Sequence, residues 1–185
     1  MALPNTLDEL RSRFNAGESF SFLHFWGHTP PRDGVITRSC FSQWYQAPFE
    51  LDGDRYPTAE HFMMAEKARL FKDEANRAQV LAAPTPGAAK ALGRKVANFV
   101  EADWLAHRFE IVCRANVAKF GQNPALRDFL TGTGKHVLVE ASPLDRIWGT
   151  GLAADDPRSN DPNLWEGPNL LGFALMQARS QLQLA

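Results

Sequence analysis

Two charged residues stand in the largely apolar stretch RYPTAEHFMMAEKARLF, residues 55–71. The stretch predicts an amphipathic helix with Thr58 as its N-cap. On that helix Glu60 and Lys67 share one face, because they are seven residues apart. Seven residues rise by about 10 Å, which is too far for a direct ion pair. The two side chains can instead line opposite ends of a cleft that holds a small molecule.

Each charge also has a simpler explanation. A glutamate in the first turn interacts favourably with the helix dipole, by a few tenths to about 1 kcal/mol. A lysine can extend from an apolar stripe to water. If Lys67 is buried instead, its pKa falls, because burial disfavours the charged form, and a neutral amine is a nucleophile.

A second candidate site lies in PLDRIWGTG, residues 143–151, which follows the strand-like HVLVEAS. A strand that ends in a glycine-rich turn can project Asp145 and Trp148 together into a cleft, with Gly149 shaping the turn. A turn that simply buries its tryptophan is the alternative.

Two further motifs can hold phosphate. In GPNLLG, residues 167–172, Asn169 opens the last predicted helix and Gly172 permits a close approach. Asn169 is most simply an N-cap, and a helix N-terminus also offers free N–H groups to a phosphate or ribose oxygen. Arg94 in LGRK is either an ordinary exposed helix residue or a forked phosphate donor.

The remaining pattern predicts a single α+β domain that is mostly helical, with a few short strands. Strands are expected within 19–27 and 136–142, a hairpin around the Asp52–Gly53 turn, and a possible short strand after the turn-rich loop in 28–39. Helices are predicted over 5–17, 72–83, 84–99, 101–121, 123–134 and 169–182. The segment 152–166 is a long loop with little periodicity, and loops of that length are often functional.

Composition narrows the function classes. The chain has 185 residues and a net charge of −1, which predicts no general electrostatic binding of nucleic acid. Two cysteines, Cys40 and Cys113, provide no disulfide framework, and five scattered histidines show no metal-ligand spacing, so no metal and no cofactor are expected. No signal peptide and no apolar run long enough for a membrane span are present, which predicts a cytoplasmic protein with no membrane partner.

In chain order, FSQWYQAPFELDGDRYPTAEHFMMAEKA, ALGRKV, FLTGTGKHVLVEASPLDRIWGTG and GPNLLG resemble the NADAR family, the YbiA-like N-glycosidases. The resemblance runs from about Phe25 to Leu182. It implies the YbiA-like fold over residues 21–185, preceded by a helical extension at 1–20.

The resemblance implies a hydrolase that cleaves the bond between ribose C1 and an amine or base nitrogen. One branch of the family acts on phosphoribosylated aminopyrimidine intermediates of riboflavin biosynthesis. Another removes ADP-ribose from guanine, so nucleic acid enters only as a modified substrate. A module that binds ADP-ribose or a nucleotide without turnover is the third alternative, although two carboxylates near an amine argue against pure binding.

Carried over by motif, Glu60, Lys67 and Asp145 become the expected catalytic residues. The expected substrate-binding residues are Trp44, Arg94, Trp148, Gly149, Asn169 and Gly172. The resemblance implies that Glu60 acts as the general base on water or stabilises the oxocarbenium ion. It implies that Asp145 binds the ribose hydroxyls or acts as the acid. A neutral Lys67 can instead form a Schiff base with an open-chain ribose, and Trp44 or Trp148 can stack on the heterocycle.

The chain departs from many relatives at three positions near these motifs. It has Met64 and Glu66 where many relatives have glutamine, and Gln43 where they have asparagine. The loop 152–166 is also longer than in the shortest relatives, which suggests a lid or a specificity element. These differences leave the expected catalytic residues in place and bear on substrate choice.

Overall fold

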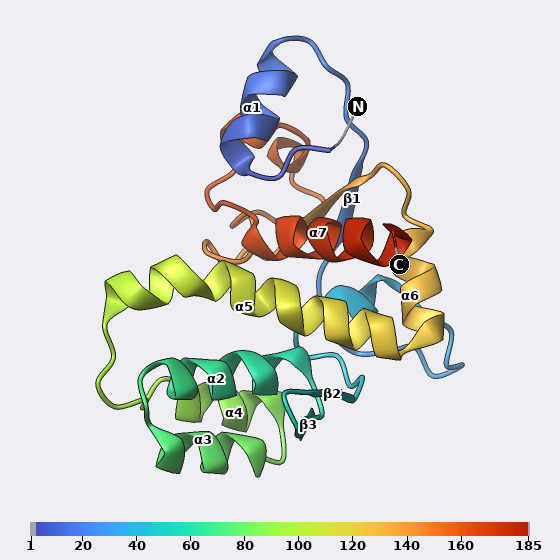
Figure 1. The fold of residues 1–185 in the computed structure, drawn as a ribbon. Coiled ribbons are helices and arrows are strands. Elements are labelled where there is room, and N and C mark those ends of the chain that lie inside the picture. The colour runs from blue at the N-terminus through green and yellow to red at the C-terminus, as the bar shows by residue number, and fades with distance from the viewer. Residues whose placement is uncertain (1–2, 185) are drawn as a thin grey trace.

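The computed structural model describes residues 3–184 and confirms an α+β fold that is mostly helical. Its two longest helices, α5 and α7, run side by side through the middle of the molecule, with α2, α3 and α4 on one side and α1 on the other (Figure 1). The α-helices are α1 (Leu7–Asn15), α2 (Ala59–Leu70), α3 (Glu74–Leu81), α4 (Pro86–Gly93), α5 (Glu101–Gln122), α6 (Pro124–Thr131) and α7 (Leu170–Leu184). Short 3-10 helices are η1 (Arg38–Phe41), η2 (Pro157–Asn160) and η3 (Pro162–Leu164).

Four short strands form two separate pairs. Strand β1 (Phe22–Phe25) pairs in parallel with β4 (Val137–Glu140), so that Phe25 and Glu140 lie opposite each other at the carboxyl ends. Strands β2 (Phe49–Leu51) and β3 (Asp54–Tyr56) form the predicted hairpin. Asp52 and Gly53 both have positive φ, 54° and 87°, as a two-residue type I′ turn requires.

The possible strand after the loop in 28–39 does not form, and η1 is found there instead. The buried side chain of Lys119 on α5 holds the C-terminal part of this segment: its Nζ donates to Cys40 O in η1 at 2.6 Å and to Ser42 O, just after η1, at 2.8 Å. A strand would commit its carbonyls to a neighbouring strand, whereas these two converge on one side chain.

Helix α2 is not amphipathic, contrary to the sequence prediction. Thr58 caps it as expected, by accepting the His61 N–H, but the residues from Ala59 to Glu66 are all buried. The helix is enclosed because it packs against α3, α4 and α5 together. Its charged residues therefore face several neighbouring elements, and each needs an ion-pair or hydrogen-bond partner, or a functional role, on its own side of the helix.

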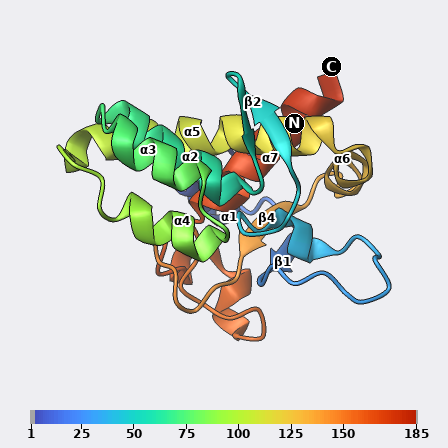
Figure 2. The ribbon, with the colours of Figure 1, turned by 90° about the horizontal axis from the view of Figure 1, so that it is seen from below.

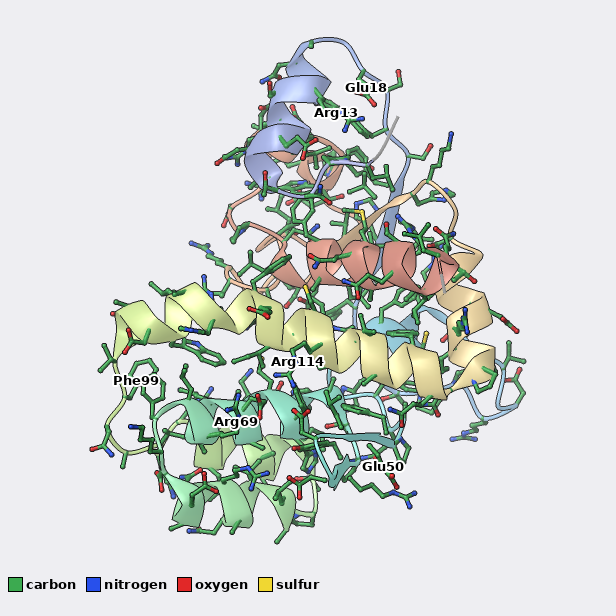
Figure 3. The ribbon with its side chains drawn as sticks, in the orientation of Figure 1. Arg13, Glu18, Glu50, Arg69, Phe99 and Arg114 are labelled. Atoms are coloured by element: carbon green, nitrogen blue, oxygen red, sulfur yellow. The ribbon has the colours of Figure 1, made fainter. Side chains whose placement is uncertain are left out.

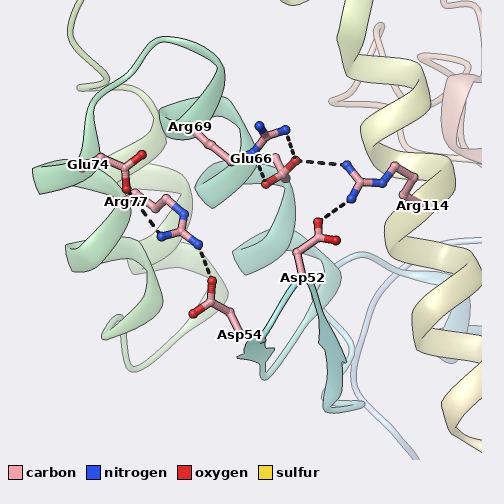
Figure 4. A network of polar contacts seen from close by, with 7 residues as sticks. All are labelled: Asp52, Asp54, Glu66, Arg69, Glu74, Arg77 and Arg114. Atoms are coloured by element: carbon pink, nitrogen blue, oxygen red, sulfur yellow. Dashed lines mark hydrogen bonds and ion pairs between the residues drawn. The ribbon is translucent and has the colours of Figure 1, made fainter.

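Glu66 has partners on two elements. Its carboxylate accepts hydrogen bonds from Arg69, one turn along α2, at 2.8 Å, and from Arg114 of α5 at 3.2 Å. Arg114 also binds Asp52 in the hairpin turn, while Arg77 binds Asp54 on the other side (Figure 4). This network ties α2, the helix that carries Glu60, to α5 and to the hairpin.

The long loop 152–166 packs beneath the N-terminal helix. Arg11 of α1 donates a hydrogen bond to Pro162 O at 2.9 Å, and Trp165 is buried, with its ring 5.8 Å from that of Phe22. Among the helices of residues 3–184, none has the length and apolar character that a membrane crossing requires.

Candidate active site

A cavity of about 330 Å³ lies where the carboxyl ends of β1 and β4 meet α2 and α4. Seen from below, α4 faces the segment that follows β4 (Figure 2). The cavity is lined by Trp26, Gly27, His28, Ser42, Gln43, Trp44, Glu60, Met63, Met64, Lys67, Lys90, Gly93, Arg94, Trp104, Glu140, Asp145, Trp148 and Leu171. The carboxyl ends of parallel strands are a common location for ligands in open α/β sheets, and this small pair follows the same geometry.

Glu60 lies in the first turn of α2, with its backbone N–H donating to Gln43 O at 3.0 Å. The residue is 3% exposed, and its Oε1 has no hydrogen-bond partner within residues 3–184. Burial raises the pKa of Glu60 to about 7, against the opposing effects of Lys90 and of hydrogen bonding by Trp44. A carboxyl group with this pKa can accept or donate a proton near neutral pH.

Lys67 lies two turns further along the same helix. Its Nζ donates a hydrogen bond to Gly93 O at 2.9 Å and lies 4.3 Å from the ring centroid of Phe99 and 5.5 Å from that of Trp104. Phe99 reaches it from the loop between α4 and α5 (Figure 3). Burial lowers the pKa of Lys67, the direction that increases the share of neutral amine.

Asp145 and Trp148 lie across the cavity, in the loop after β4. Asp145 Oδ1 accepts the backbone N–H groups of Ile147 and Trp148, each at 2.8 Å. These bonds fix the loop, so Asp145 and Trp148 face the cavity together. Both residues line the cavity.

Helix α4 supplies the cationic side of the cavity. Gly93 packs so closely on α2 that a Cβ atom there would overlap the Met64 side chain, and this contact brings the α4 C-terminus to the site. Lys90 Nζ lies 5.7 Å from the ring centroid of Trp44, and Arg94 lies exposed at the rim.

Gly149, Asn169 and Gly172 do not line the cavity. The Asn169 side chain binds β4, accepting the Glu140 N–H at 2.9 Å and donating to Leu138 O at 2.9 Å. A Cβ at Gly172 would overlap Leu138 O, and one at Gly149 would lie 2.7 Å from Glu140 O. These three residues hold β4 and the following loop in place from behind, which corrects their expected position at the substrate.

The loop 152–166 does not line the cavity either, because it packs on α1 and β1. Its link to the site is indirect. Glu166 at the end of the loop pairs with Arg146, next to Asp145, at 2.8 Å. The expectation of a lid over the cavity is therefore not met by this arrangement.

Glu140 and Lys90 also line the cavity, and neither was predicted from the sequence. Glu140 ends the HVLVE strand. Its position at the carboxyl end of a parallel strand, where ligands often bind, could have identified it as a site residue. Burial raises the pKa of Glu140 to about 8, with the nearby Asp145 and Glu60 adding to the effect and Lys90 opposing it. Lys90 gave no signal, because a single lysine on an alanine-rich helix is typical of a solvated face.

The cavity thus combines three carboxyl groups, two lysines and three tryptophan side chains besides the exposed Trp26. Among residues 3–184, no group of three or more histidine, cysteine, aspartate or glutamate side chains is arranged to hold a metal ion. This set of groups suits acid–base and nucleophilic chemistry on a small planar substrate. Fold and site together are those of an α+β protein with a cavity equipped for acid–base chemistry.

The family model of the NADAR domain matches residues 24–183, so the chain belongs to the NADAR family. It is 40% identical over 171 residues to N-glycosidase R617 of Acanthamoeba polyphaga mimivirus, covering 90% of this chain and 99% of the relative. It is 31% identical over 144 residues to N-glycosidase YbiA of Escherichia coli, covering 78% and 81%. The NMR structure of E. coli YbiA superimposes with a TM-score of 0.71 at 27% identity, covering 90% of this chain and 88% of that one.

Proposed function

We propose that this protein hydrolyses the C–N bond between ribose C1 and the nitrogen of a phosphoribosylated aminopyrimidine. The enzyme class, a hydrolase of N-glycosyl bonds, follows from relatives named N-glycosidase that the chain covers over 99% and 81% of their length. The observation that supports the substrate and the residue roles is that Glu60, Lys67 and Asp145 line one cavity with Trp44, Arg94 and Trp148.

The cavity fits the parts of such a substrate. Trp44 and Trp148 offer ring faces for the heterocycle. Lys90 and Arg94 provide positive charge for the phosphate from one helix end. A volume of about 330 Å³ is at the low end for ligand sites, as expected for a mononucleotide-sized molecule.

Lys67 and Glu60 act in sequence in the proposed mechanism. The neutral amine of Lys67 attacks C1 as the bond to the base nitrogen breaks. A proton then passes from the bound lysine nitrogen to the ring oxygen as the C1–O bond of the ring breaks, and the sugar opens to a protonated imine at C1. Glu60 then takes a proton from water, which adds to C1 and releases the lysine amine. Asp145 holds the ribose hydroxyls. Lowering of the Lys67 pKa and raising of the Glu60 pKa to about 7 both favour these roles.

The test is a panel of ribosylated amines, with free ribose phosphate or free ADP-ribose detected by mass spectrometry. We expect catalytic release of ribose phosphate from phosphoribosylated aminopyrimidines. Release of ADP-ribose from ADP-ribosylated guanine alone would move the protein to the second branch. Stoichiometric binding without turnover of any substrate would contradict an enzyme and favour a binding module.

A further inference from the structure

Glu140 is held in the wall of the cavity by its own backbone. Its N–H donates to Asn169 Oδ1 at 2.9 Å, and its carbonyl accepts the Thr150 N–H at 3.0 Å. The residue ends β4, opposite Phe25 of β1. With the main chain fixed on three sides, the side chain has a defined direction into the cavity that Glu60 and Asp145 also line.

The carboxyl group of Glu140 has unused hydrogen-bonding capacity. Its Oε2 is buried and has no hydrogen-bond partner in the part of the chain that the structure describes. Leaving a buried polar atom unpaired is unfavourable, so such atoms in a cavity often await a ligand. Burial and the neighbouring carboxylates favour the protonated form, whose O–H is a donor.

The other two carboxyl groups suit different roles. Asp145 Oδ1 already accepts two backbone N–H groups, so this oxygen is occupied in holding the loop. Hydrogen bonding by Trp44 favours the charged form of Glu60, whereas Lys90 favours the charged form of both glutamates. Glu140 is the carboxyl group of the cavity that is best placed to stay protonated and to present a donor.

We infer that Glu140 is the general acid that protonates the departing nitrogen, a role that rests on the N-glycosidase reaction proposed above. As Lys67 Nζ bonds to C1, the C1–N bond breaks and its electron pair passes to the leaving nitrogen. That nitrogen takes the Glu140 proton, which leaves a Glu140 carboxylate. When Glu60 later takes a proton from water, one proton passes from Glu60 to Glu140 through solvent, and the site is restored.

This role has a consequence for leaving groups. An amine leaving as an anion is a poor leaving group, and proton transfer matters most for the most basic nitrogens. Electron-withdrawing substituents on the pyrimidine reduce the need for the acid. Loss of Glu140 should therefore slow the reaction of basic aminopyrimidines far more than that of electron-poor ones.

The experiment measures kcat/KM against pH for a phosphoribosylated aminopyrimidine series with wild type, Glu140→Gln, Glu140→Asp and Glu50→Gln. Glu50 is an exposed glutamate on β2 and serves as the matched control. We expect Glu140→Gln to lose roughly 10²–10⁴-fold with the most basic leaving group and to lose the alkaline decline that the acid causes. Its dependence on leaving-group basicity should be steeper than that of wild type. Glu50→Gln should match wild type throughout.

The outcomes separate the two proposals. A wild-type protein that releases no ribose phosphate from the series refutes the proposed function itself. An active wild type with Glu140→Gln within threefold of it, and with the alkaline decline unchanged, overturns the role of Glu140. If Glu140→Gln does not fold, as judged by circular dichroism, Glu140→Asp decides. It should keep the alkaline decline with at least tenfold lower kcat, and an unaltered kcat overturns the inference.

Discussion

The side-chain oxygen of Asn169 accepts the backbone N–H of Glu140 at 2.9 Å, although 29 residues separate them in the chain. The amide nitrogen of Asn169 donates to Leu138 O, so a single side chain holds the end of β4 from the start of α7. Asn169 also has a φ of 54°, in the left-handed region where asparagine is favoured over most residues. The last helix therefore sets the position of a cavity residue that it does not itself contain.

Asn169→Ala should lower the free energy of unfolding by about 2–4 kcal/mol, because two buried hydrogen bonds are lost and alanine is strained at positive φ. Equilibrium denaturation in urea measures this. Asn98→Ala is the matched control, because Asn98 has a φ of 56° with an exposed side chain. The control isolates the conformational cost, about 1 kcal/mol. Equal losses in both variants would show that the hydrogen bonds to β4 contribute nothing.

The ion-pair network on Glu66 leads to a second comparison. Arg114→Ala should destabilise the protein by about 1–2 kcal/mol, because Arg114 joins α5 to Glu66 of α2 and to Asp52 of the hairpin. Arg69→Ala should cost less than about 1 kcal/mol, because Arg69 is more exposed and its ion-pair partner, Glu66, lies in the same helix. Urea denaturation of both variants, at low and high salt, checks the order. A larger loss for Arg69→Ala would contradict the inter-helix role.

Much of the fold was accessible from the sequence because its signals are local. The cap at Thr58 and the Asp52–Gly53 turn depend on neighbouring residues, and both are confirmed. Burial of α2 on every side was not accessible, because it depends on packing against α3, α4 and α5. The same holds for η1, whose carbonyls bind Lys119 almost eighty residues away.

The site divides in the same way. Glu60, Lys67, Asp145 and Trp148 were chosen by motif, and the structure brings them to one cavity. Asn169 and Gly172 belong to an equally distinctive motif, yet they pack on the backbone of β4. A motif identifies residues that matter to the fold and to the site alike, and only the spatial arrangement separates the two.

Glu60→Gln should change how stability depends on pH. Below about pH 4.5, the usual pKa of a glutamate, both folded and unfolded Glu60 are protonated. As pH rises from there to about 7, the unfolded state loses its proton while the folded state keeps it, so the wild-type free energy of unfolding falls. Glutamine removes this fall. The variant should therefore gain stability relative to wild type across that window, by up to about 3 kcal/mol, and by a constant amount above it.

Urea denaturation from pH 4 to 8 measures this difference, and hydrolysis should be abolished in the same variant. Because glutamine introduces its own constant cost, the slope and not the offset is the informative quantity. Glu50→Gln, on the exposed face of β2, should run parallel to wild type. A Glu60→Gln curve parallel to wild type would show that the folded carboxyl group titrates like an unfolded one.

The order of events at Lys67 and Glu60 can be tested by trapping. If Lys67 attacks C1 and Glu60 later activates water, borohydride added during turnover should reduce the imine and leave a ribosyl phosphate adduct on Lys67. Glu60→Gln should accumulate more of this adduct than wild type, because its hydrolysis is blocked while its formation is not. Peptide mass spectrometry locates the modified lysine.

Lys67→Ala should give no adduct and no hydrolysis while unfolding near the wild-type temperature, because its amine packs at the edge of the core over Phe99 and Trp104. Lys95 is an exposed lysine on the loop after α4, and Lys95→Ala should retain both the adduct and the activity. An active wild type that yields no reduced adduct would remove Lys67 as the nucleophile. Water activated by Glu60 would then attack C1, and Lys67 would act as a cation beside the substrate.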